Sequence, residues 1–320
     1  MSTNATPDIS LILTAYNFEA YIEAAIQSLL QQDTGWQFEL IVVDDCSSDG
    51  TLAKIQAFQD KRIRLIQHTQ NKGAAASINE AFALARGRYV GRFDGDDVWL
   101  PHFLSSTVAV LEQNPQVGLV YGDVAFIDSQ GAILNPHSPV PNYNGLEKPA
   151  LLQALLSDYL ICAPAILARR EAWALAFPLP EYLLYCDFEM ALHMATQWEF
   201  CYLPQVLAQY RLHPQNMHSM AVRQRRAEVS IMDTLQRFRA KFPTLLNHSS
   251  WNGVYQQRYL QLGDQYFGAG EMVEARRCYW SGGAHLQVKK PEYFRRWLAS
   301  YLPIAWYIFI KKKIKALVNA

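Results

Sequence analysis

The chain has no excess of charge of either sign, because 29 Lys and Arg balance 29 Asp and Glu over 320 residues. Proteins that bind nucleic acid through its phosphates concentrate Lys and Arg for that purpose. The overall charge gives no sign of this, and we expect no nucleic acid among the partners of the protein. Half of the residues are hydrophobic, which predicts a folded chain with one large domain and a smaller one.

Cysteine is scarce and irregularly spaced. An odd number of cysteines, with neither a CxxC pair nor a Cys/His pattern, argues against a disulfide framework and against a zinc site. This set favours a reducing, cytoplasmic setting. The five positions are Cys46, Cys162, Cys186, Cys201 and Cys278.

Long hydrophobic runs are also missing. The N-terminus, MSTNATPDIS, lacks the basic and apolar segments of a secretion signal. The uncharged stretch WLASYLPIAWYIFI has 14 residues, whereas a membrane-spanning helix needs about 20. Its aromatic residues and the Lys-rich segment 311–315 suit a membrane surface. We expect residues 291–320 either to contact the inner face of the plasma membrane peripherally or to pack on the protein as a C-terminal helix.

The first 125 residues contain a regular alternation of strand and helix signals. Helical spacing of apolar residues, as at Ile22 and Ile26, indicates helices between the strands. Asn17 is the expected N-cap of the first helix, and Gly87 is the expected C-terminal cap of a helix over 73–86. This order predicts an α/β fold with a mostly parallel sheet flanked by helices. Apolar runs predict the strands at residues 9–15, 38–43, 63–68 and 88–93, and a strand and hairpin from residue 117.

Polar side chains gather where these strands end. Thr14 closes the first strand, the pair Asp44 and Asp45 ends the second, and an acidic cluster follows the fourth. Ligands of parallel sheets bind at the carboxyl ends of the strands. We therefore expect these groups to meet at one rim of the sheet, while His68, after the third strand, is expected at the surface.

The acidic cluster lies in RFDGDDVW, which holds three carboxylates within four positions. In extended geometry residues two apart face the same side, so Asp94 and Asp96 are expected to form a pair of oxygen ligands. Carboxylates this close are costly unless a cation neutralises them. Mg²⁺ or Mn²⁺ is the natural candidate, since no Cys or His stands beside them. The alternative is that they cap the helix expected near Pro101, a role open to Asp97.

The rest of the chain is more helical. Residues 136–149 are rich in Pro, Asn and Gly and predict a loop. Beyond about residue 223 the signals are all helical, and residues 259–287 resemble one tetratricopeptide-like helical hairpin, with Gly263, Tyr266, Gly270 and Ala275 at its small and aromatic positions. The expected domains are 1–222 and a helical region over 223–320 that ends in the basic, aromatic tail.

Three segments in this order resemble the family 2 glycosyltransferases: LTAYN, IVVDDCSSDGT and NKGAAASINEAFALARGRYVGRFDGDDVWLP. The resemblance covers about residues 8–222 and implies the nucleotide-sugar-binding GT-A fold. It also implies transfer of a sugar from a nucleoside diphosphate, UDP by default, to an acceptor hydroxyl with inversion at the anomeric carbon. A saccharide or lipid-linked acceptor, in the synthesis of a cell-surface polysaccharide or glycolipid, is the corresponding expectation.

The resemblance also assigns roles on the donor side. Asp45 would bind the nucleobase with support from Asp44, and Lys72 would approach the donor. Asp94 and Asp96 would form the DXD element that binds the metal and donor, with Asp96 in direct metal contact. The residues that would line the base pocket are Thr14, Ala15 and Tyr16.

The segment YRLHPQNMHS resembles a conserved family stretch in which a basic residue and a histidine close over the diphosphate. Arg211 is suited to phosphate oxygens because its guanidinium is planar and permanently charged. His213 would be a third metal ligand or a phosphate donor.

The catalytic base is expected in LLYCDFEMALHMA, where the family has an acidic pair, then an apolar residue and Arg. Aligned in this way, Asp187 is the base, His193 replaces the Arg, and Cys186 replaces the first acidic residue. Glu189 is the rival base. On a helix its side chain lies about 200° from that of Asp187, so only one of them can face the cleft. Asp187 could also be a helix N-cap, a role that does not exclude catalysis.

Two other functions stay open at this point. A nucleotidyltransferase would carry a Gly-rich, basic loop after the first strand, but LTAYNFEAY has no glycine. A non-catalytic scaffold that binds a nucleotide-sugar and recruits partners through its helical tail is compatible with the departure at Cys186.

Overall fold

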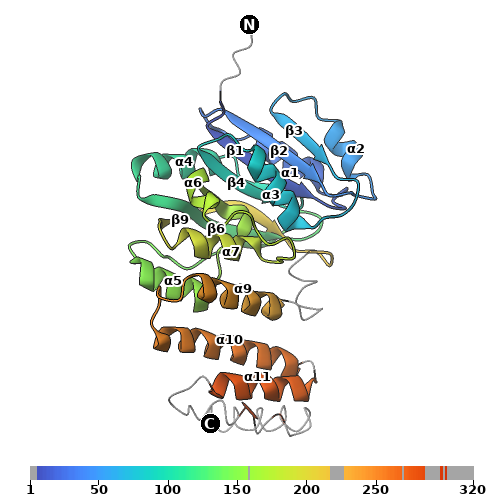
Figure 1. Ribbon diagram of the computed structural model, residues 1–320. Coiled ribbons are helices and arrows are strands. Elements are labelled where there is room, and N and C mark those ends of the chain that lie inside the picture. Colours follow the sequence, from blue (N-terminus) through green and yellow to red (C-terminus); the bar gives the residue numbers. More distant parts are fainter. Residues whose placement is uncertain are drawn as a thin grey trace, which may run out of the picture. The chain divides into compact units, whose positions relative to one another are not determined.

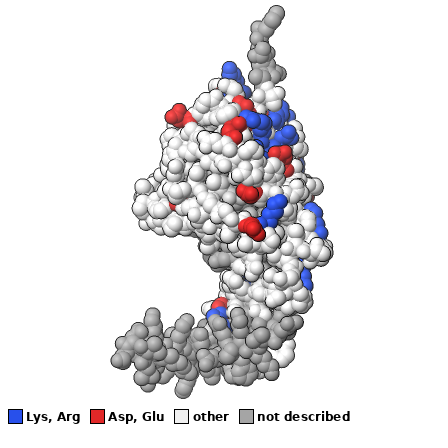
Figure 2. Space-filling model, turned by 90° about the vertical axis from the view of Figure 1, so that its left-hand side faces the viewer, with Lys and Arg blue, Asp and Glu red and all other residues white. Residues whose placement is uncertain are grey.

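The computed structural model describes residues 6–157, 159–216, 227–268 and 270–284, together with 296, 297 and 300. The chain divides into two compact units, Met1–Met220 and Ala221–Ala320. The domain boundary at residue 222 remains a prediction about which parts fold independently. In Figure 2, acidic and basic side chains lie intermixed on the visible face of the first unit and do not form separate fields.

The first unit begins with four parallel strands in the order β3-β2-β1-β4 (Figure 1). The four strands predicted from apolar runs are confirmed, with bounds shifted by a residue at most. Their bounds are β1 Ile9–Ala15, β2 Phe38–Asp44, β3 Ile63–Gln67 and β4 Tyr89–Asp94, and the helices between them are α1 Ile22–Leu30, α2 Thr51–Gln56 and α3 Ala74–Leu84.

The antiparallel strand β8 (Ile166–Arg169) joins this parallel half to the rest of the sheet. The full order is β3-β2-β1-β4-β8-β6-β9-β5, and β7 pairs with β6 as the expected hairpin. The remaining strands are β5 Val98–Trp99, β6 Val117–Ile127, β7 Ile133–Ser138 and β9 Glu199–Arg211. The other helices that the structure describes in this unit are α4 Phe103–Gln113, α5 Lys148–Ser157, α6 Arg170–Ala174 and α7 Cys186–Met194, with a 3₁₀ turn at Ala163–Ala165.

The core forms where the helical apolar stripes meet the sheet. Every residue of β1 is buried, and its alternate residues Leu11 and Leu13 pack in one cluster with α1 and α4. The buried positions of α1 are those that the helical spacing predicts: Ile22, Ala25, Ile26 and Leu29. Burying each such aliphatic side chain stabilises the fold by about 1.5–3 kcal/mol.

Two capping predictions are wrong, for identifiable reasons. Asn17 adopts φ 57° and its Oδ1 accepts hydrogen bonds from Ser48, so it joins two loops, and α1 starts five residues later. Helix α3 already ends at Leu84, and Ala85 is its C-cap residue. Gly87 serves a close approach to β1 instead, because a Cβ there would lie 2.5 Å from the backbone of Ile9.

The register of the sheet aligns the ends of distant strands. Thr14 in β1 pairs with Asp94 in β4, and Ala15 pairs with Asp44 in β2. On the other side of β8, Ile127 at the end of β6 pairs with Arg211 at the end of β9. The polar groups that follow these strands are thereby brought to one rim of the sheet.

The second unit contains α9 (Ala227–Lys241), α10 (His248–Gly268) and α11 (Met272–Ala284). Helices α10 and α11 pack against each other around Phe267, Ala275 and Tyr279. Gly263 permits this contact, since a Cβ at that position would lie 2.5 Å from the Tyr279 ring. The turn between the helices contains Gly270 at φ +82°.

Most of the predicted membrane-contacting tail, 291–320, lies outside the described residues. Within the part of the chain that the structure describes, no helix is both long and apolar enough to span a bilayer.

Candidate active site

The site begins with a buried arginine and a carboxylate at the end of β4. Arg92 Nη2 donates to both oxygens of Asp94, at 2.7 and 2.9 Å. Thr14 Oγ1 donates to Asp94 Oδ1 from the neighbouring strand, at 3.2 Å. Burial raises the pKa of the Asp94 carboxyl, while Arg92 opposes that rise and the nearby Asp96 and Asp187 add to it. Asp94 is therefore part of a cluster of like charges held together by one buried cation.

Asp96 and Asp97 do not continue the strand. Residues 95 and 96 form a turn after β4, so the prediction that Asp94 and Asp96 face one side in extended geometry is wrong. Asp96 Oδ2 lies 2.9 Å from Nε2 of His213, a residue 117 positions away. The Asp97 carboxylate accepts a 2.8 Å hydrogen bond from the backbone N–H of Arg211, so Asp97 holds β9 and does not cap α4.

Arg211 is buried at this rim, where it stabilises the turn. Its Nε donates to the carbonyl of Asp96 at 2.7 Å and its Nη1 to the carbonyl of Asp128 at 3.0 Å. Its guanidinium lies 4.8 Å from the centre of the Tyr21 ring. Two of the three guanidinium nitrogens thus bind the protein itself, and the expected phosphate contact rests on the remaining one.

The predicted base, Asp187, lies in the first turn of α7. Burial raises the pKa of its carboxyl, and Arg92, the Phe188 backbone N–H and the Tyr159 hydroxyl oppose that rise. Tyr159 forms no hydrogen bond of regular geometry within the described residues, so its effect on Asp187 comes from proximity. Asp187 and Asp94, 93 positions apart in the sequence, therefore share the influence of Arg92.

The neighbours of Asp187 on α7 face other partners. Burial raises the pKa of the Cys186 thiol to about 12, so this residue adds no charge to the cluster at neutral pH. The rival base Glu189 lies 3.6 Å from Nε2 of His193, and Nδ1 of that histidine contacts the Leu175 carbonyl at 2.8 Å. The charge of Asp187 is among those that act most strongly on Arg92, and Glu189 is the more deeply buried of the two carboxylates. Both observations favour Asp187 over Glu189 as the residue facing the cleft.

The pair expected at the nucleobase, Asp44 and Asp45, is divided between two environments. The Asp45 carboxylate binds the backbone N–H groups of Lys72 and Gly73 at 2.8 Å and Nδ1 of His68 at 2.7 Å. Asp44 is equally buried, but its Oδ1 has no hydrogen-bond partner among the described residues. Asp45 thus holds the loop before α3, and Asp44 presents the unsatisfied oxygen.

Around this pair the remaining predicted donor residues take different positions. His68 is buried, contrary to expectation, and its Nε2 lies 3.0 Å from Glu80. The Lys72 side chain is exposed and binds Glu80 at 3.2 Å. Ala15 is buried and its carbonyl accepts the N–H of Asp45, whereas the Tyr16 side chain is 47% exposed. Tyr16 is therefore the residue of this group most available to a ligand.

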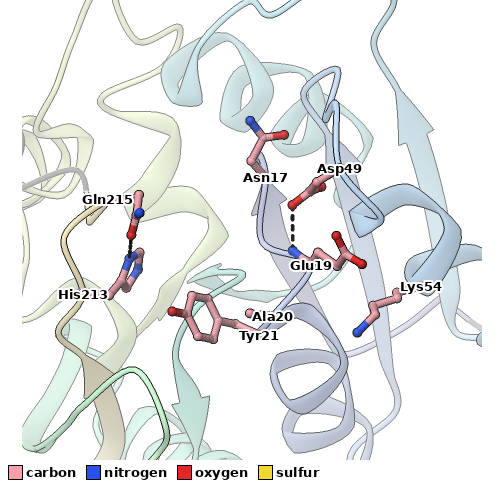
Figure 3. Close-up of a pocket in the computed structure, with 8 residues that line it drawn as sticks. All are labelled: Asn17, Glu19, Ala20, Tyr21, Asp49, Lys54, His213 and Gln215. Carbon is pink, nitrogen blue, oxygen red and sulfur yellow. Dashed lines mark hydrogen bonds between the residues drawn. The ribbon is translucent and has the colours of Figure 1, made fainter.

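A polar pocket of about 540 Å³ opens beside the carboxylate cluster. Its walls come from the loop after β1, the loop after β2, helix α2 and the segment after β9. Figure 3 shows Tyr21 directed toward His213, with Asn17 and Asp49 across the opening. Because His213 also contacts Asp96, this pocket adjoins the turn that follows β4.

The metal prediction can be tested against these contacts. Two of the three expected ligands, Asp96 and His213, lie side by side, while Asp94 is bound to Arg92. Among the described residues, no three Cys, His, Asp or Glu side chains form a ready metal site. Since Mg²⁺ takes few protein ligands and completes its coordination with water and substrate phosphates, the oxygen and imidazole donors fit a site that the diphosphate would complete.

Two residues of the cluster were not among those predicted from the sequence. The sequence contained a signal for Arg92, because a charged residue inside an otherwise apolar strand needs a buried partner. It contained no signal for Tyr159, since only the tertiary fold brings this residue near Asp187.

Comparison with known proteins identifies the family of the chain. The model of the family described as glycosyl transferase family 2 matches residues 10–174, just over half of the chain. The chain belongs to the family 2 glycosyltransferases. The resemblance drawn from its motifs is confirmed.

Curated proteins of related sequence match part of this family 2 chain. It is 36% identical over 125 residues to the UDP-Glc:alpha-D-GlcNAc-diphosphoundecaprenol beta-1,3-glucosyltransferase WfgD of Escherichia coli, covering 39% of this chain and 49% of that protein. It is 32% identical over 149 residues to the succinoglycan biosynthesis protein ExoO of Rhizobium meliloti, covering 46% and 42% respectively. The chain thus spans about half the length of the curated relatives it matches.

Solved structures share the fold over most of the chain. TarS residues 1–349 of S. aureus, in complex with UDP-GlcNAc, superimpose with a TM-score of 0.63 and cover 89% of this chain and 82% of their own. The mannosyltransferase PcManGT of Pyrobaculum calidifontis, in complex with GDP-Man and Mn²⁺, gives 0.58, with 99% and 87% covered. Each is 17% identical to this chain. The expected GT-A fold is confirmed.

Proposed function

We propose that the protein is a metal-dependent, inverting glycosyltransferase that moves a sugar from a nucleoside diphosphate to an acceptor hydroxyl. The observation that supports this best is the meeting of Asp94 with Asp187 around Arg92. A donor-side carboxylate and a carboxylate base are thereby brought to one cluster from distant parts of a family 2 chain.

Asp187 is the general base in this proposal. A base works best when its pKa lies near the working pH, and burial moves the pKa of the Asp187 carboxyl upward in that direction. Its carboxylate removes the proton of the acceptor hydroxyl as the oxygen attacks the anomeric carbon from the face opposite the diphosphate. One base and a direct displacement invert the configuration at that carbon.

The donor binds along the rim formed by the ends of β1, β2 and β4. Thr14, Ala15, Tyr16, Asp44 and Asp45 receive the nucleobase and ribose, with Lys72 at the edge. Asp94, Asp96 and His213 hold Mg²⁺ or Mn²⁺, which when bound offsets the charge of the departing diphosphate. Arg211 keeps the turn that carries Asp96 in place and offers its remaining nitrogen to phosphate.

The names of relatives supply the substrate class. UDP-Glc appears in the name of WfgD and UDP-GlcNAc in the TarS complex, so we propose a UDP-sugar donor. WfgD is named for glucosyl transfer to GlcNAc-diphosphoundecaprenol and ExoO for succinoglycan biosynthesis. These names support our proposal of a saccharide or lipid-linked acceptor in polysaccharide or glycolipid synthesis. Peripheral contact of 291–320 with the cytoplasmic leaflet would place the enzyme near such an acceptor.

The proposed function is tested with the Asp187→Asn variant of the full chain. Removing a general base costs about 10²–10⁴ in rate, so we expect at least a hundredfold loss of sugar transfer to a panel of acceptors in the presence of Mn²⁺. Calorimetric binding of UDP should be unchanged, because Asp187 does not touch the donor's nucleotide in this proposal. Glu189→Gln is the matched control and should retain transfer. Transfer by Asp187→Asn at the wild-type rate would remove Asp187 from its role.

A further inference from the structure

Arg92 is a buried cation in the middle of the sheet. It pairs with Ile12 of β1 in the strand register and is 5% exposed. A guanidinium is rarely buried to this extent without anionic partners. Its Nε has no hydrogen-bond partner among the described residues, so the charge is compensated mainly through Nη2 and Asp94.

The contact with Asp94 engages the whole carboxylate. Nη2 lies within hydrogen-bond distance of both Asp94 oxygens, and Asp94 is more exposed than Asp96 and Asp97, with 28% of its side chain accessible. This accessible carboxylate therefore already has a permanent cation bound to it.

A divalent cation that arrives alone meets two obstacles at this position. Arg92 repels it, and Asp94 must leave a close charge pair before it can serve as a ligand. Asp96, the other expected carboxylate ligand, is likewise in contact with His213. A cation bound to a diphosphate brings its own negative charge, which removes the repulsion and gives the guanidinium a new anionic partner.

We propose that Arg92 is a positioning residue that makes cation binding conditional on the nucleotide: it holds Asp94 in the donor-free protein and releases it to a cation that arrives with a diphosphate. This inference rests on the proposed function, since it concerns the same donor site. It predicts that the cation and the nucleotide bind together and that each strengthens the binding of the other.

The test is calorimetric titration of the full chain with Mn²⁺, without and with saturating UDP. The ratio of the two Kd values measures the coupling between the ligands. For wild type we expect weak binding of Mn²⁺ alone and a large ratio. In Arg92→Met the affinity for Mn²⁺ alone should rise by about tenfold, the lower end of the coupling between close charge pairs, and the ratio should fall by the same factor. Arg92→Lys keeps the charge with a different donor geometry and should give an intermediate ratio.

Arg169→Met is the matched control. Arg169 lies on the neighbouring strand β8, where it donates to the carbonyls of Val117 and Leu111, and its loss should leave the ratio unchanged. A wild-type ratio in Arg92→Met overturns the inference; if that variant fails to fold, a wild-type ratio in Arg92→Lys does so. Failure of wild type to bind UDP in the presence of Mn²⁺ would instead refute the proposed function. Sugar transfer by wild type, together with unchanged ratios in the variants, would refute this inference alone.

Discussion

Asp45 and Asp187 are both carboxylates withdrawn from solvent, one after β2 and the other at the start of α7, but the chain surrounds them differently. The Asp45 carboxylate is bound by two backbone N–H groups and a histidine ring. For Asp187, the rise that burial causes in its pKa is opposed first by the charge of Arg92 and then by N–H groups of its own helical turn. A carboxylate tied to the backbone of another segment fixes that segment, whereas one held by a buried arginine and by the N–H groups of its own helical turn fixes no loop, and we propose that it serves in proton transfer. The parallel half of the sheet thus builds the frame, and the segments after β8 bring the proposed base to it.

The difference between the two carboxylates can be tested most directly at Asp45. Asp45→Ala leaves two N–H groups of the loop before α3 without their acceptor, and each buried unsatisfied group costs about 1–3 kcal/mol. We expect the free energy of unfolding to fall by roughly 3 kcal/mol in total, as measured by urea denaturation. The free energy of unfolding of Asp187→Asn should fall by no more than a small fraction of that amount. If the two variants were equally destabilised, the distinction between frame and reactive group would be wrong.

A second test uses the pH dependence of sugar transfer. The base must be deprotonated to act, and burial holds the pKa of Asp187 above the ordinary Asp value, which is about 3.9. We therefore expect kcat to be full above this raised pKa and to fall as the pH drops through it, tenfold per pH unit on the acid side. Initial rates at saturating donor and Mn²⁺ would measure it. A flat profile down to the ordinary Asp range would contradict the assigned environment.

The smallest effect is expected at Tyr159. Its hydroxyl favours the charged form of Asp187, so Tyr159→Phe should move the acid limb of the rate profile to higher pH by a fraction of a unit. The rate at the plateau should be nearly unchanged, because the base is still present. A matched profile of Tyr143→Phe, a tyrosine on the loop after β7, serves as the control. A shift toward lower pH in Tyr159→Phe would show that the hydroxyl stabilises the protonated acid.

Local sequence patterns were sufficient to predict the strands of the parallel half of the sheet and the buried face of α1. Continuous apolar runs predicted the parallel strands, and helical spacing predicted the buried face of α1, because both depend on residues close together in the sequence. The same reasoning was wrong at Asn17 and Gly87. Their roles are to join two loops and to admit a neighbouring strand, and both contacts are with residues more than 30 positions away.

The candidate active site could be predicted less completely from local sequence patterns. The acidic residues at the rim were found because strand ends collect in α/β sheets, but the turn at residues 95–96 places Asp94 and Asp96 in separate contacts. Arg92 and Asp187 meet only through β8 and α7, whose placement no periodicity specifies. The motif resemblance supplied Asp187, and the physical reason for its setting came from the fold.

Arg211 also connects the site to a distant part of the sheet. It binds the carbonyls of Asp96 and Asp128, and Asp128 opens the tight turn between β6 and β7 in which Gly131 has φ +85°. The length of that turn is therefore tied to the position of Asp96, one of the residues proposed to hold the metal beside the diphosphate. An insertion of one residue at the tip of the hairpin would shift Asp128 and, through the Arg211 side chain, the turn that carries Asp96. We therefore expect evolution to accept substitutions in this hairpin more readily than insertions.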